Sequence, residues 1–461
     1  MNPFAWQTVE GTYTRPFDAL EKYEYHMSTM PLPPSATFTT TNQRAVIVGA
    51  TLSPSVTVGI ADIKSAWRRL RYAHPILECS IIPAGFSFTP RSPEEIDKWV
   101  DSTVTIIPAN FQDIKEYKSK NNVKEISANP PRNADSAELY FSPSSNQLFL
   151  QLRHEIIDGV GSIMLLNNLL TLLLTPPPQE EIPQETPSLL PRSVTELTNA
   201  APTDEALIQK NNLLVQNYFS KTPISLPLPQ SLPNPYESHR FEYTFPASTS
   251  KSLLSRCKKE GISITHATTA AAALSILKST GEEAGTFSTT FPVSLRHTLP
   301  HPYNTPKYAA SFCITSPLPT IPLSKSTPLI SLSKAVKKEY EDWRNDKDAI
   351  RYHEPQLQLF EHAIRAGKTP SNAASSTGAT VVVSSLGIIE NHLTTQGVDE
   401  FWIGQVQATT PKIVVFLYTF AGRIHLAASY NRHFHEDGFV EGFVRVVVET
   451  LGEGLDVAVT A

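Results

Sequence analysis

Cysteine is scarce in this sequence, and its scarcity excludes two kinds of architecture. The chain has 461 residues and three cysteines, Cys79, Cys257 and Cys313, with no Cys-X-X-Cys pair. A disulfide framework needs an even set of cysteines, and a structural zinc site needs clustered thiolate or imidazole ligands. We therefore expect three buried thiols and no metal.

Basic charge and long apolar runs are lacking as well. Lysine and arginine total 39 against 44 aspartates and glutamates, which gives a formal net charge of −5. Such a chain, without a polybasic stretch, has no electrostatic footprint for nucleic acid or a membrane surface. The longest apolar segment, SIMLLNNLLTLLL, is shorter than the roughly 18 residues of a membrane span. The first residues do not resemble a signal peptide, so we expect a cytoplasmic protein.

Proline is abundant instead, and its clusters divide the chain. There are 38 prolines against 19 glycines, concentrated at 175–193 and 223–238. Such segments cannot continue a helix or fill a central strand. Because the chain is too long for one simple core, we expect a first domain at 1–195, a proline-rich crossover linker at 196–238 with a short helix at 204–221, and a second domain at 239–461.

Each half shows alternating strand and helix patterns. In the first, 61–77 has helical spacing and ends near Pro75, LECSII follows as a strand, 147–154 alternates as a strand, and 161–174 is a buried helix. In the second, 261–280 is a helix capped by Ser263 or Thr265. Strands are expected at 286–295 and 380–387, a hairpin turning at Ala-Gly within 412–431, and a last helix at 439–454.

One pattern, His, any three residues, Asp, Gly, occurs twice. HEIIDG spans 154–159 and HFHEDG spans 433–438, each between an expected strand and an expected helix. A histidine where a strand ends can be held rigidly as a general base. Asp158 can tie the loop to a cation, and Gly159 allows a tight turn into the helix. Coincidence and a metal pair of His154 with Asp158 are the competing interpretations of so short a motif.

Four stretches in order resemble the CoA-dependent acyltransferase superfamily. They are YAHPILECSI, LRHEIIDGVGSIMLLNNLL, GISITHATTAAAALSIL with FPVSLR, and VVVSSLGIIENHL with LAASYNRHF. The superfamily includes chloramphenicol acetyltransferase, the plant BAHD enzymes, peptide condensation domains and fungal secondary-metabolite O-acetyltransferases such as the trichothecene 15-O-acetyltransferase. The resemblance covers roughly residues 15 to 450, on the ordered set of motifs.

The resemblance implies a fold and a site. The fold is α/β (α+β), with two chloramphenicol-acetyltransferase-like domains, each a mixed β-sheet with helices, and a tunnel between them. His154 matches the catalytic base, Asp158 and Arg296 match a structural pair, and Ser384 and Ser385 match hydroxyls that face the reacting centre. The two serines can equally satisfy backbone groups at the end of a strand.

Two departures from the family narrow the choice of relatives. The plant enzymes carry DFGWG where this chain has VDEFWIGQ (398–405), and many condensation domains carry a second histidine where this chain has Arg153. Both favour a stand-alone O-acyltransferase like the fungal enzymes. HFHEDG lies at the equivalent position of the second domain, and we interpret it as coincidence in a solvated loop.

The sequence therefore predicts a monomeric enzyme that moves a short acyl group, such as acetyl, from acyl-CoA to a hydroxyl of a small natural product. Acyl-CoA would be a co-substrate, with no bound cofactor, and its binding residues cannot be assigned. One competing interpretation is a condensation-like transferase whose donor is held by an acyl carrier protein. Others are a docking module or a cyclisation enzyme with the same fold.

Overall fold

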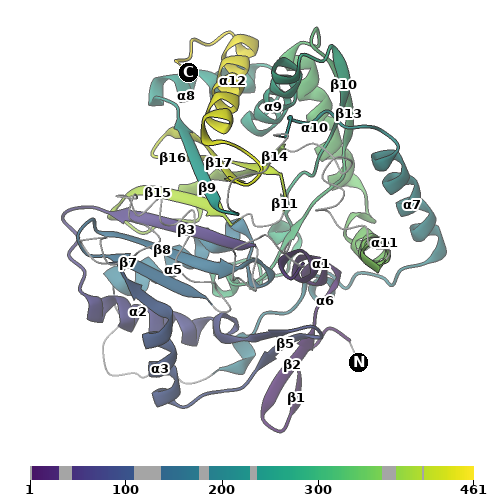
Figure 1. Cartoon of the computed structure of the whole chain (residues 1–461). Coiled ribbons are helices and arrows are strands. Elements are labelled where there is room, and N and C mark those ends of the chain that lie inside the picture. Colours follow the sequence, from purple (N-terminus) through teal and green to yellow (C-terminus); the bar gives the residue numbers. More distant parts are fainter. Residues whose placement is uncertain are drawn as a thin grey trace.

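Two mixed β-sheets, one built mainly from each half of the chain, organise the structure (Figure 1). The computed structural model describes residues 3–30, 44–107, 137–175, 186–228, 236–365, 381–406 and 410–460. The first sheet has the strand order β15 (Val398–Gln405), β3 (Ala45–Leu52), β8 (Gln147–Arg153), β7 (Glu138–Ser142) and β6 (Val104–Ile106). The second has the order β14 (Val381–Ile388), β16 (Ile413–Phe420), β17 (Arg423–Asn431) and β9 (Ser238–Thr244).

The first sheet carries helices whose sequence patterns explain their limits. They are α2 (Ile60–Ala73), α3 (Pro93–Thr103) and α5 (Gly159–Leu174). α2 ends at Ala73, and Pro75 lies just beyond its C-cap His74, as predicted. Ser92 and Glu95 close a capping box at the start of α3. Strand β8 alternates as predicted, but both of its faces are buried: its leucines lie in the main core, whereas Phe149 packs in a second cluster with Trp402.

The second sheet carries α8 (Ala247–Lys259), α9 (Ile264–Thr280), α10 (Leu329–Asn345) and α12 (Asp437–Leu455). Ser263 caps α9 by accepting a hydrogen bond from the N–H of His266, so one of the two predicted caps is confirmed. The hairpin of β16 and β17 turns at Ala421 and Gly422, both with positive φ, as the sequence predicts. The first pair of strands in this sheet, β14 and β16, is parallel.

Strand β15 crosses from the second half of the chain into the first sheet (Figure 1). It pairs antiparallel with β3, and Trp402 lies opposite Gly49, where a Cβ atom would come within 2.3 Å of the indole. The missing side chain at Gly49 thus lets the indole sit against the neighbouring strand. The predicted division at 196–238 does not separate the two sheets completely, because this strand belongs to the first.

Smaller sheets complete the fold. One joins β1 (Gln7–Val9), β2 (Thr12–Pro16), β5 (Gly85–Phe88) and β4 (Ser80–Ile82); others pair β10 (Ala284–Ser288) with β13 (Thr320–Ser324) and β11 (Val293–Ser294) with β12 (Ile314–Thr315). The single strand predicted at 286–295 is therefore wrong. It divides between two sheets, because Phe291 turns into the core and Pro292 has no N–H to donate to a ladder.

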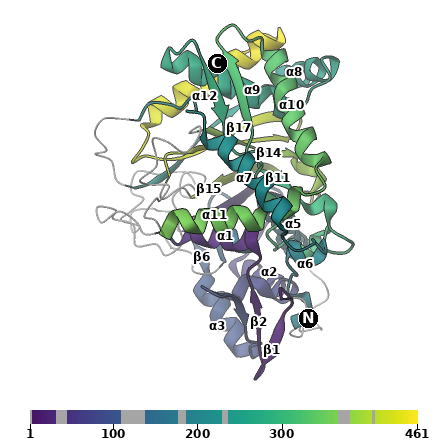
Figure 2. The same cartoon turned by 90° about the vertical axis from the view of Figure 1, so that its right-hand side faces the viewer.

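Three helices lie on one side of the two sheets, at the right in Figure 1. Helix α1 (Ala19–Ser28) lies beside α11 (His353–Arg365), and α7 (Glu205–Phe219) packs near them (Figure 2). The predicted linker contains α7, which confirms the short helix, together with residues 229–235, which are outside the described part. The short helix α6 (Val194–Leu197) precedes it, and most of the first proline-rich segment, 176–185, is also outside the described part. No helix in the described ranges is long and apolar enough to cross a membrane.

Candidate active site

His154 stands directly after β8, on the loop that leads into α5. Its Nδ1 lies 2.9 Å from the carbonyl oxygen of Ile157, and its ring edge meets Phe312 with centroids 5.5 Å apart. A carbonyl oxygen only accepts hydrogen bonds, so Nδ1 carries the proton of the neutral ring. The Nε2 atom is then unprotonated, and it has no partner within the described part of the chain. A histidine in this tautomer can act as a base.

Asp158 faces away from that imidazole and fastens the two halves of the chain. Its Oδ1 accepts the N–H of Gly161 at 2.7 Å, and it thereby caps α5. Its Oδ2 accepts from Arg296 Nη2 at 3.0 Å and from the N–H of Cys313 at 2.9 Å. The structure therefore brings together the two residues that the resemblance pairs.

Arg296 is buried and donates to several acceptors besides Asp158. Its guanidinium bonds the carbonyl oxygens of Tyr308, Ala309 and Ser311 at 2.9 to 3.2 Å. Burial acts to lower the pKa of Arg296, but the charge of Asp158, the nearby Cys313 and the hydrogen bond to Asp158 together outweigh it, and the pKa is raised. A permanently charged arginine in this place holds the loop 308–311 against the start of α5.

The glycines of the motif are needed for space and not for an unusual backbone. Gly159 does not have a positive φ, so the conformational freedom expected of it is not used. A Cβ atom there would lie 2.8 Å from Leu386 Cδ2. The tighter position is Gly161, where a Cβ atom would come within 2.4 Å of Arg296 Nη2 and 2.5 Å of the Ala309 carbonyl. The sequence analysis missed this second glycine of HEIIDGVG.

His154 opens onto a cavity of about 470 Å³ between the two halves. Side chains of α1, β3 and the loop after β8 line it from the first half, and β14, β16, α7 and α11 contribute from the second. Much of the lining is apolar, including Val46, Phe312, Val382, Leu386, Val414 and Phe416. An enclosed apolar site with a few polar groups suits a small organic molecule.

Ser384 and Ser385 also line this cavity, on β14, but their surroundings differ. Ser384 pairs in register with Phe416, another cavity residue, and within the described residues its hydroxyl has no hydrogen-bond partner. Ser385 pairs with Leu417, which is buried in the second core, and its hydroxyl lies 2.8 Å from that of Thr265 on α9. The strand alternation thus puts Ser384 on the same face of β14 as the cavity residues Val382 and Leu386, whereas the hydroxyl of Ser385 is engaged by Thr265.

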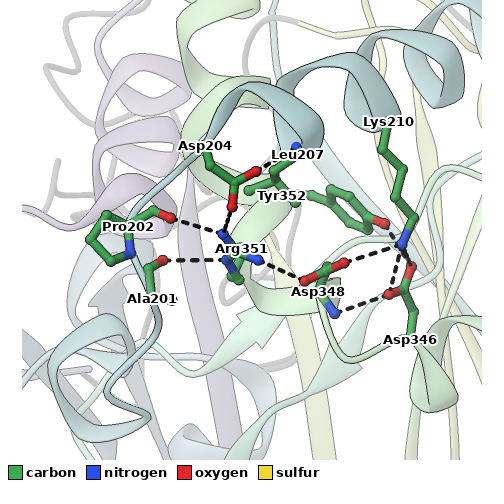
Figure 3. A network of polar contacts seen from close by, with 9 residues as sticks. All are labelled: Ala201, Pro202, Asp204, Leu207, Lys210, Asp346, Asp348, Arg351 and Tyr352. Carbon is green, nitrogen blue, oxygen red and sulfur yellow. Dashed lines mark hydrogen bonds and ion pairs between the residues drawn. The ribbon is translucent and has the colours of Figure 1, made fainter.

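A polar network holds α7 against the segment before α11, so that both helices can line the cavity (Figure 3). Arg351 donates to Asp204 and Asp348, and it also reaches the carbonyl oxygens of Ala201 and Pro202. The other members, shown in the same view, are Lys210, Asp346, Tyr352 and the N–H of Leu207. From these helices Phe219 and Phe360 extend to the cavity wall.

HFHEDG is not the solvated loop that its sequence suggests. His433, Phe434 and His435 are buried, and the ring of His433 stacks on Tyr236 at 3.7 Å. His435 Nε2 bonds the carbonyl oxygen of Pro411 at 2.6 Å, whereas Asp437 pairs with Arg432. The hexamer is buried despite its polar residues, because His433 and Phe434 both pack against the ring of Tyr236. His433 is not among the residues that line the cavity.

A metal ion needs several ligand side chains close together, and the described residues do not provide them. In the described ranges, no group of three or more His, Cys, Asp and Glu side chains could hold an ion, and the carboxylate of Asp158 is occupied by Arg296 and two backbone N–H groups. Arg153, at the place of a second histidine, forms a buried pair with Glu155 at 2.8 Å.

Curated proteins with similar sequences are fungal. No family model matches the sequence. It is 25% identical over 468 residues to the O-acetyltransferase pigM of Monascus ruber, covering 98% of this chain and 87% of that protein. It is 26% identical over 331 residues to the azaphilone biosynthesis cluster protein M of Aspergillus terreus, covering 68% and 77%. The chain is a distant homologue of fungal O-acetyltransferases.

Solved structures show the same fold. The TRI3 trichothecene 15-O-acetyltransferase of Fusarium sporotrichioides matches with a TM-score of 0.72 at 15% identity, over 97% of this chain and 98% of that one. The condensation domain of the monacolin K polyketide synthase MokA matches with a TM-score of 0.62 at 12% identity, over 98% of each chain. These matches confirm the predicted α/β fold. The resemblance drawn from the motifs is confirmed by the sequence relatives together with this fold, as distant homology to fungal O-acetyltransferases.

Three charged cavity residues were missed from the sequence. They are Glu24, Arg44 and Lys412. Lys412 carries the one readable signal, since it directly precedes the apolar strand IVVFLYTF. Glu24 and Arg44 come together from different segments, and no local pattern marks them.

Proposed function

We propose that this protein is an O-acyltransferase that moves an acetyl or other short acyl group from acyl-CoA to a hydroxyl group of a small natural product. The observation that carries the proposal is the contact of His154 Nδ1 with the Ile157 carbonyl oxygen, which leaves Nε2 as the basic nitrogen of a histidine that lines the mainly apolar cavity. The distant homology to fungal O-acetyltransferases supports the reaction type.

In the proposed reaction, His154 Nε2 takes the proton of the acceptor hydroxyl while the oxygen attacks the thioester carbonyl carbon. A tetrahedral intermediate forms and then expels the thiolate of CoA. The imidazolium returns the proton to that sulfur, so no covalent acyl-enzyme is needed. Bringing both substrates together in one cavity supplies part of the acceleration. Asp158 and Arg296 position the loop and take no part in proton transfer.

Ser384 is the better candidate of the two serines for stabilising the oxyanion. Its hydroxyl is on the cavity face of β14 and has no partner in the described part, whereas Ser385 bonds Thr265. A hydroxyl donor aimed at the developing negative charge lowers the barrier.

Thiol release from a panel of acyl-CoAs, from short to long and without acceptor, tests the donor and the base together. We expect slow hydrolysis by the wild-type enzyme, reduced about 10²- to 10⁴-fold in His154→Ala. His297→Ala, an exposed histidine, is the matched control, and His433→Ala tests the rival hexamer. Circular dichroism checks that each variant is folded.

Near-normal hydrolysis by folded His154→Ala would overturn the assignment. Release of thiol from no acyl-CoA would count against the proposed donor without excluding transfer, because water can be a poor acceptor. A thioester held by an acyl carrier protein would then be the next donor to test, by binding and transfer.

For the serines we expect an asymmetry. Ser384→Ala should reduce turnover by about 10²-fold with little change in thioester binding, as for loss of one oxyanion donor. Ser385→Ala should keep most of the turnover, because its hydroxyl is already bonded to Thr265. Equal effects of the two substitutions would contradict the role given to Ser384.

A further inference from the structure

Beside His154 the cavity holds charged side chains that the proposed reaction does not use. Glu24 comes from α1, Arg44 from the residue before β3, and Lys412 from the residue before β16. Glu24 Oε2 pairs with Arg44 Nη1 at 3.1 Å. Arg44 is also a backbone neighbour of His154, whose N–H lies 3.3 Å from its carbonyl oxygen. The backbone of Arg44 is therefore next to that of the proposed base, and the three charged residues line the same cavity as His154.

Lys412 is the member of this group without a counter-ion. Within the described residues it has no hydrogen-bond or ion-pair partner, and the carboxylate of Glu24 is engaged by Arg44. Along its strand Lys412, Val414 and Phe416 all line the cavity, as alternation requires. Burial, with a smaller effect of the nearby Arg44 charge, lowers the pKa of Lys412 to about 8. The ammonium is thus largely charged at neutral pH in a mainly apolar site.

Besides the Lys412 ammonium, a second polar atom of this charged group lacks a hydrogen-bond partner among the described residues. Glu24 is 3% exposed, and its Oε1 has no hydrogen-bond partner in the described part of the chain. A partly buried ammonium without a partner and a buried carboxylate oxygen without a partner each cost stability unless something binds them. Both costs are offset if a ligand in the cavity supplies the missing partners.

We propose that Lys412 is a specificity-determining residue that binds an anionic oxygen on the acceptor, such as a carboxylate or an enolate, while His154 takes the proton of the acceptor's hydroxyl. Only the role of His154 in this inference rests on the proposed function; binding of the anionic oxygen by Lys412 does not. One unpaired ammonium in a cavity of about 470 Å³ matches one negative charge on a small molecule. The several phosphates of a CoA would need several cations. Glu24 Oε1 accepts a hydroxyl or N–H of the same acceptor.

Calorimetry with matched acids and esters tests the recognition without any acyl donor. The probes are 6-(hydroxymethyl)-2-naphthoate and the shorter 4-(hydroxymethyl)benzoate, each with its methyl ester. We expect the wild-type protein to bind at least one acid about 10- to 100-fold more tightly than its ester, as for a charge-assisted hydrogen bond. Lys412→Met should remove this preference and keep the affinity for the ester.

Two further variants separate this inference from the proposed function. Lys251→Met, an exposed lysine of α8, should behave as wild type. His154→Ala should keep the preference for the acid while turnover is lost, so that failure of either proposal can be recognised. Equal affinities for acid and ester in the wild type, no binding of either acid, or a preference that survives in Lys412→Met would overturn the inference.

The pH dependence of binding gives a second readout. Affinity of the wild type for the acid should fall as the pH rises through about 8, because Lys412 loses its proton there, and affinity for the ester should not. The other titratable groups around the cavity are Tyr23, Glu24, Arg44, His154, Asp158 and His353, with His435 behind Pro411. A fall that persists unchanged in Lys412→Met would assign the titration to one of them and contradict the proposal.

Discussion

His154 and Asp158 belong to one hexamer, yet their hydrogen bonds run in opposite directions. The imidazole is fixed by the carbonyl oxygen of Ile157 and opens to the cavity, whereas the carboxylate binds Arg296 and the N–H of Cys313. The same letters at 433–438 place a histidine against Tyr236 instead. A motif of this length therefore acquires its chemistry from the contacts around it.

At Gly161 the site depends on a missing side chain. Gly161→Ala would push a methyl group into Arg296 Nη2 and the Ala309 carbonyl, and we expect it to lower the free energy of unfolding by about 1–3 kcal/mol. Gly442→Ala, on an exposed turn of α12 with open space around it, should stabilise by roughly 0.5–1 kcal/mol. Thermal or urea unfolding of the two variants compares them. An unchanged free energy of unfolding in Gly161→Ala would mean that the loop 308–311 can shift to make room for the methyl group at little cost.

At the scale of elements, the contact between the two sheets is polar and specific. Arg240 of β9 donates to the carbonyl oxygen of Ile403 on β15 at 2.9 Å and to Glu242 at 2.7 Å. Tyr418 of β16 and His425 of β17 each lie 2.7 Å from Glu242 Oε1. Through Arg240, the second sheet thereby contacts β15, the strand of the first sheet that comes from the second half of the chain.

This network predicts a pH dependence of stability. Burial acts to raise the pKa of Glu242, but Arg240 and the hydrogen bonds from His425 and Tyr418 outweigh it and hold the pKa well below its usual range. The resulting stabilisation is present above the unfolded pKa of about 4.3 and is lost as the pH falls below it. Glu242→Gln should therefore destabilise by about 1–3 kcal/mol at pH 7, and the difference from wild type should shrink toward pH 3.

Urea unfolding at several pH values measures that difference. Glu449→Gln, on the exposed side of α12, is the matched control and should change stability little at any pH. A Glu242→Gln deficit that is the same at pH 7 and pH 3 would contradict the assigned ionisation.

Elements set by local patterns could be predicted from the sequence, and elements set by distant partners could not. β8, the loop at His154 and α5 follow from strand alternation and a helical apolar run. The hairpin at Ala421 follows from its turn residues. The pairing of β15 with β3, the split of 286–295 and the gathering of Glu24, Arg44 and Lys412 depend on segments far apart in the chain. The Asp158–Arg296 pair, also distant in sequence, was accessible through the resemblance alone.

At the scale of the whole molecule, the first half needs the second to complete its sheet, because the second half supplies β15. A fragment of residues 1–228 lacks β15, so the backbone of β3 would be left unpaired at an apolar edge. We expect this fragment to aggregate when it is expressed alone and to become soluble when residues 229–461 are co-expressed. Size-exclusion chromatography distinguishes these results. A soluble, cooperatively unfolding 1–228 fragment would show that the edge needs no partner.

The three cysteines, scarce as they are, sit in three different places. Cys79 is in the core of the first sheet, Cys257 in that of the second, and Cys313 beside Asp158 where the halves meet. Burial raises the pKa of each thiol, to about 11 for Cys257 and about 12 for Cys313. A thiolate-selective label can then reach each one only when its surroundings open. The protein thus carries one native reporter for the opening of each sheet and a third for the separation of the two halves.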